Sequence, residues 1–91
     1  MMKMERAQIV RSLAGHDMGS LLCVMDTEGE FLYVADGKTR KVESPKRKRA
    51  KHVEVVAAPD HPTIEKFRAG HPVGNQELRR ALAALRDEME V

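Results

Sequence analysis

Short apolar runs separated by turn residues occupy the first two-thirds of the chain. The runs cover residues 8–13, 21–25, 31–35, 39–43 and 53–55. Runs of this length between Gly, Asp, Ser or Pro residues are typical of β-strands. The pattern therefore predicts five short antiparallel strands, of which residues 21–25 are the most buried because that run is continuously apolar and rich in β-formers.

The turn residues between these runs agree with a sheet. Asp36-Gly37 is a strong signal for a tight hairpin, and it predicts pairing between residues 31–35 and 39–43. Pro45 ends that pairing because proline has no backbone N–H to donate to a ladder. Five short strands in about fifty residues are too few for two packed sheets, but they can curl into a small closed barrel without exposed edges.

The pattern changes after the fifth run. Proline-containing breaks surround residues 63–69, which predicts one or two helical turns within a linker over residues 59–74. Asn75 is a good N-cap for a final helix over residues 75–91. Four apolar side chains repeat there at the spacing of one helix face: Leu78, Leu82, Leu85 and Met89. This stripe either packs on its own domain or pairs with another chain, in a complex or a dimer.

A chain of 91 residues has room for one domain with a small core. We place the barrel at residues 1–58 and include in it a basic loop over residues 44–52. Phe31, Tyr33 and the single cysteine, Cys23, are expected in the core. A lone buried thiol fits a reducing compartment, and no apolar run is long enough to span a membrane, so we expect a soluble cytoplasmic protein.

The charges are distributed unevenly. Residues 38–52 contain eight Lys and Arg side chains and one acid, Glu43, for a net charge of +7. The rest of the chain carries eight basic and thirteen acidic side chains, for a net charge of −5. A surface charged only for solubility would mix the two signs, so this asymmetry indicates a site for a polyanion.

Residues 10–25 contain a strand, a glycine-rich turn and a second strand, with Gly15, Asp17 and Gly19 in the turn. This stretch resembles the KOW motif. Together with the Asp-Gly hairpin and the Lys/Arg run, residues 7–57 resemble the short bacterial KOW-domain RNA-binding proteins. These are similar to KOW-barrel ribosomal proteins of the large subunit in archaea and eukaryotes.

The resemblance implies an SH3-like antiparallel barrel, so that the expected fold is mainly β with a C-terminal α-helix. It also implies that Gly19 occupies a position that a side chain would obstruct, and that loops on one face contact RNA or protein. The turn departs from the family pattern at His16 and Met18, where KOW turns often carry lysine.

RNA binding is the function that these features predict. The expected contacts are the basic side chains of the charged window: Lys38, Arg40, Lys41, Lys46, Arg47, Lys48, Arg49, Lys51 and His52. Because the chain has few aromatic side chains on which bases could stack, it should recognise a structured RNA by shape, with ribosomal RNA on the ribosome as the expected partner. The protein would then act in translation.

A protein-interaction module is the alternative. The barrel or the C-terminal helix would then dock on a transcription or translation factor. The sequence has no nucleophile and base pair, phosphate-binding glycine loop or metal-ligand spacing, so we expect neither an enzyme nor a metal or cofactor site.

Overall fold

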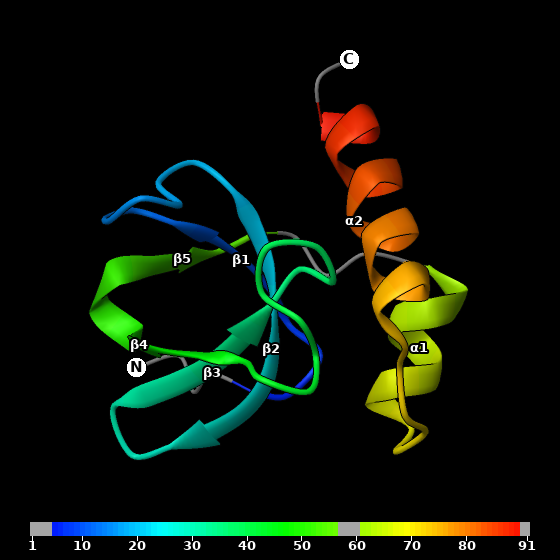
Figure 1. Ribbon diagram of the computed structural model, residues 1–91, viewed down its shortest axis with the longest axis horizontal. Helices are drawn as coiled ribbons and strands as arrows, with labels where there is room; N and C mark the ends of the chain where they lie inside the picture. Colours follow the sequence, from blue (N-terminus) through cyan, green and yellow to red (C-terminus); the bar gives the residue numbers. More distant parts are fainter. Residues whose placement is uncertain (1–4, 57–60, 90–91) are drawn as a thin grey trace.

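The computed structural model describes residues 5–56 and 61–89, which form one antiparallel sheet and two helices (Figure 1). The strands are β1 (Ile9–Ser12), β2 (Leu21–Glu28), β3 (Phe31–Ala35), β4 (Lys46–Arg49) and β5 (Val53–Val55). A 3-10 turn, η1 (Ala50–His52), joins β4 to β5. The helices are α1 (Pro62–Arg68) and α2 (Asn75–Met89), and neither is long and apolar enough to cross a membrane, as far as the structure describes the chain.

The strand order is β4-β3-β2-β1-β5. The mainly β class and the C-terminal helix are therefore confirmed. The sheet is open within the described residues, because β4 and β5 form its two edges and share no ladder. Their direct connection through η1 nevertheless keeps the two edges close in sequence.

The fourth strand lies elsewhere than predicted. Residues 39–43 belong to the connection between β3 and β4, whereas part of the predicted basic loop forms β4. The Asp36 carboxylate accepts hydrogen bonds from the backbone N–H groups of Lys38 and Arg40, both at 2.8 Å. This side chain closes the chain into a compact turn, so the strand that pairs with β3 begins only after Pro45.

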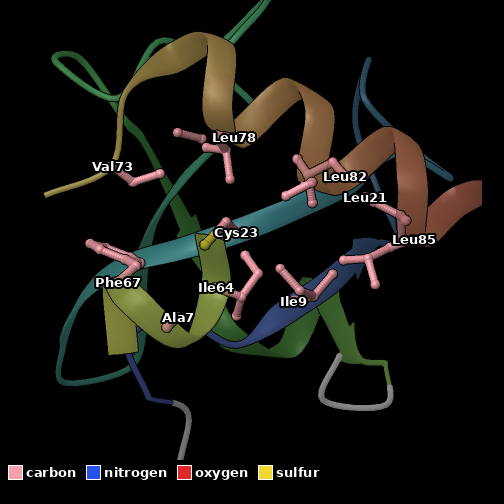
Figure 2. Close-up of a cluster of buried hydrophobic side chains, with 12 residues drawn as sticks. Ala7, Ile9, Leu21, Cys23, Ile64, Phe67, Val73, Leu78, Leu82 and Leu85 are labelled. Atoms are coloured by element: carbon pink, nitrogen blue, oxygen red, sulfur yellow. The ribbon is translucent and has the colours of Figure 1, made fainter. Parts of the chain in front are cut away.

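Each face of the sheet carries a cluster of buried apolar side chains. Val10, Leu22 and Val24 pack with residues of β3 and β5 on one face. On the other face, Ile9 and Cys23 pack against the two helices (Figure 2). The first four residues of β2 are buried, as expected for the central strand.

Cys23 confirms the expectation of a buried thiol. It lies at the centre of the core between the sheet and the helices, and none of its surface is exposed (Figure 2). Burial raises the pKa of the thiol to about 12, against a small opposing effect of the Arg6 charge. At neutral pH the side chain is a protonated, apolar core group.

The C-terminal segment contributes seven of the twelve buried residues of that core. Within the stretch predicted as a linker, α1 buries Ile64 and Phe67 against the sheet, while the Pro59-Asp60 break lies outside the described residues. Leu78, Leu82 and Leu85 are buried as well, so the stripe of α2 packs on its own domain. These leucines are consequently not available to a partner helix. Only Met89, 45 % exposed, remains at the surface.

Candidate nucleic-acid interface

The turn between β1 and β2 is held by its own polar side chains. Gly15 and Gly19 both have positive φ, at +88° and +89°, which confirms that this turn needs glycine. A Cβ at Gly19 would have no atom within 4 Å, so the expected obstruction at this position is wrong. The Ser12 hydroxyl donates to Asp17 Oδ1 at 2.8 Å and fixes the carboxylate inside the turn.

Lys48 forms an ion pair with the Asp17 carboxylate. Its ammonium donates to Asp17 Oδ1 and to the backbone oxygen of Ala14, both at 2.9 Å, and the residue is only 7 % exposed. The charge of Lys48 therefore attaches β4 to the β1–β2 turn, and its contact with RNA stays a prediction. Lys46, with its ammonium 3.8 Å from Asp17 Oδ2, lies at the edge of the same pair.

The electrostatics of Asp17 agree with this structural role. Burial on its own would raise the pKa of the carboxyl group. The hydrogen bonds from Lys48 and Ser12, with the charges of Lys48 and Lys46, outweigh burial and hold the pKa of Asp17 below its usual value. Asp17 is therefore ionised at neutral pH.

Strand alternation separates the basic run into two faces. Lys46 and Lys48 point toward Asp17, whereas Arg47 and Arg49 lie on the opposite, exposed face of β4. The sequence interpretation of one loop that fans all of these charges along RNA is therefore wrong. Arg47 and Arg49 are exposed, Lys46 is half-buried and Lys48 is buried.

The two exposed arginines lie over one aromatic ring. The guanidinium carbons of Arg47 and Arg49 are 4.5 and 5.4 Å from the centroid of Phe31. Antiparallel pairing produces this contact, since Phe31 lies opposite Arg49 and Tyr33 lies opposite Arg47. Phe31 and Tyr33 are half-buried on the outer face, so their predicted place in the core is wrong.

A groove of about 440 Å³ runs beside these arginines. Its walls come from the β1–β2 turn, β3, β4 and η1, and it is lined by Ala14, Gly15, Phe31, Lys46, Arg47, Lys48, Arg49 and His52. No acidic side chain of the described residues lines it. Arg49 has Glu30 at 3.8 Å across exposed surface, a contact that contributes little.

The remaining predicted contacts lie apart from this groove. Lys51 is exposed in η1 next to His52. Lys38, Arg40 and Lys41 belong to the connection between β3 and β4 and do not line the groove. The structure thus brings together Lys46, Arg47, Lys48, Arg49 and His52, of which Lys48 is paired with Asp17, and adds Phe31, which sequence reasoning missed.

One feature of the sequence indicates that Phe31 could lie at a surface site. It alternates with Leu32 and Val34, so one of the two sets had to face outward. The basic partners opposite it become apparent only when the register of β4 is known.

The described residues contain no group of three His, Cys, Asp or Glu side chains that could hold a metal ion. Neither a scan against protein-family models nor a search of curated proteins gives a match to this chain.

Proposed function

We propose that this protein binds structured RNA through the groove beside β4, as a KOW-type domain associated with the ribosome in the cytoplasm. The observation that carries the proposal is the pair of arginines stacked on Phe31 at the wall of an acid-free groove.

The chemistry of arginine suits both parts of an RNA strand. A guanidinium can donate two parallel hydrogen bonds to phosphate oxygens, and its plane can stack on a base. Because Phe31 restricts the rotamers of Arg47 and Arg49, less conformational entropy is lost when they bind. Lys46 and His52 supply further hydrogen-bond donors.

The fold supports the KOW assignment without a closed ladder. The order β4-β3-β2-β1-β5 puts the first strand beside the last, as a five-stranded barrel requires. Lys48 spans from the β4 edge to the β1–β2 turn, and η1 links the two edge strands. We therefore propose that the sheet belongs to the SH3-like barrel class, with Lys48 attaching the β4 edge to the β1–β2 turn.

Salt dependence tests the proposal. Binding of a structured RNA, such as a ribosomal RNA fragment, is measured at several salt concentrations for the parent and for R47Q/R49Q. Loss of two phosphate contacts should make the plot of log K against log salt shallower by about 1.4 to 1.8. The matched control is R68Q/R80Q, which removes two exposed arginines of the helices and should keep the parental slope.

A flat salt response in the parent, with no effect of R47Q/R49Q, would contradict RNA binding. That outcome would leave the protein-interaction module, docking through the outer face of the sheet because the leucines of α2 are buried.

A further inference from the structure

A second basic hollow lies between the β3–β4 connection and α2. It measures about 240 Å³ and is lined by Asp36, Lys38, Arg79, Leu82, Ala83 and Arg86. Arg79 and Arg86 are seven residues apart, two turns of helix, and therefore share one face of α2. The small side chain of Ala83 lies between them along the helix and leaves room for a ligand.

The hollow is held in shape by contacts between distant parts of the chain. Asn75 begins α2, but its side chain does not act as the predicted cap: its Oδ1 accepts from the backbone N–H of Val42 at 2.8 Å. Its amide donates to Glu43 at 2.7 Å, and this hydrogen bond lowers the pKa of that carboxyl group. The connection is thus fastened to the first turn of the helix.

Close packing at Gly37 completes this attachment. With φ of +80°, Gly37 lies against the helix so tightly that a Cβ would collide with the carbonyl oxygen of Asn75. The same Cβ would be 3.2 Å from Cγ of Arg79. The neighbouring Lys38 is therefore placed next to Arg79 by the fold itself.

The charges of this hollow are not balanced internally. Lys38, Arg79 and Arg86 form no ion pair with any acid in the described ranges 5–56 and 61–89. The one carboxylate, that of Asp36, already accepts two backbone hydrogen bonds at Oδ1. The hollow therefore contains three cationic side chains and one carboxylate, and that carboxylate is hydrogen-bonded to the backbone of its own turn. Such an excess of positive charge favours the binding of an anion.

The hollow on α2 adjoins a third, smaller hollow at Asp36. A third hollow of about 160 Å³ is lined by Arg40 and His16, and it shares Asp36 with the hollow on α2. It also includes Asp17, the partner of Lys46 and Lys48. The third hollow thus has both basic and acidic lining residues, and it shares none of them with the groove beside β4.

We infer that Lys38, Arg79 and Arg86 form a second phosphate-binding site, through which α2 holds the same RNA that binds at β4. This inference rests on the proposed function, and it enlarges the interface beyond the charged window of the sequence. The sequence did not indicate this second site, because the C-terminal segment has a negative net charge. Helix periodicity nevertheless places Arg79 and Arg86 on one face of α2.

The test compares three double variants on one structured RNA: R79Q/R86Q, R47Q/R49Q and R68Q/R80Q. Glutamine keeps the side-chain stem of Arg79 that packs near Gly37. R79Q/R86Q should lower affinity and make the salt slope shallower by about 1.4 to 1.8, while R68Q/R80Q keeps it. K38Q, which lies outside the helix, should reduce the slope by about 0.7 to 0.9.

Two outcomes separate the inference from the function on which it rests. If R47Q/R49Q reduces the slope but R79Q/R86Q and K38Q do not, the second site is wrong and RNA binding at β4 stands. If no variant changes the slope, both proposals fail. Combining R47Q/R49Q with R79Q/R86Q should add the two reductions, as contacts with one RNA require.

Discussion

Lys48 and Asp17 form a largely buried ion pair, 2.9 Å between Nζ and Oδ1, that connects an edge strand to a turn 31 residues earlier in the chain. Removing one charge of such a pair leaves the other without its partner. We expect K48M to lower the free energy of unfolding by about 2 to 4 kcal/mol. Denaturant titration measures this loss.

K51M is the matched control, because Lys51 is exposed in η1. It should change the free energy of unfolding by less than about 0.5 kcal/mol. The combined variant D17N/K48M should recover part of the loss, since no unpaired charge remains. Equal stabilities of K48M and K51M would show that the pair contributes nothing.

The lowered pKa of Asp17 predicts a specific acid sensitivity. A carboxyl group whose pKa is lower in the folded than in the unfolded state stabilises the fold above the unfolded pKa, about 3.9. This contribution is lost as the pH falls through the folded pKa. The parent should therefore lose more stability than D17N when the pH is lowered from about 6 to about 2, as followed by urea midpoints.

Two glycines of positive φ should differ in their tolerance of a side chain. G37A adds both backbone strain and a collision with Asn75, so we expect a loss of several kcal/mol or failure to fold. G19A adds only strain, because nothing lies within 4 Å, and should cost about 1 to 2 kcal/mol. Thermal midpoints compare them. A more severe effect at Gly19 would contradict the contact between Gly37 and α2.

Phe31 should affect RNA affinity without affecting charge. F31L removes the ring that orders Arg47 and Arg49 but keeps both charges, so affinity should fall about two- to fivefold at an almost unchanged salt slope. Y33L, which removes a neighbouring half-buried ring on the same face, is the control and should have a smaller effect. Equal affinities of F31L and the parent would show that the stack plays no part in binding.

The sequence was most informative where a pattern has only one physical solution. The continuous apolar run of β2 could be placed because its length and its β-formers fit a buried strand, and the leucine stripe of α2 because it follows the helical period. The position of β4 could not be predicted, because four consecutive cations usually indicate a solvent-exposed loop. They form a strand here because β4 lies at the edge of the sheet, where one set of side chains faces solvent and the other set lies near Asp17.

The candidate site was predicted in charge but not in arrangement. The basic window contained Arg47 and Arg49, but the sequence alone could not show that Lys48 pairs with Asp17. Nor could it show that Arg79 and Arg86 line a hollow together with Lys38. Asn75 illustrates the same limit: it matched the preference of a helix cap, but its partners lie 32 and 33 residues away. Such long-range choices depend on the register of β4 and on the packing of α2.

The composition of β4 has a consequence for self-association. An edge strand offers unpaired backbone groups to any second strand, and β4 consists entirely of lysine and arginine. Two such strands would repel each other, so these charges oppose pairing of β4 with the same strand of another copy. Variants that neutralise Arg47 and Arg49 reduce this repulsion. Their oligomeric state should be measured by size-exclusion chromatography before their RNA affinities are compared.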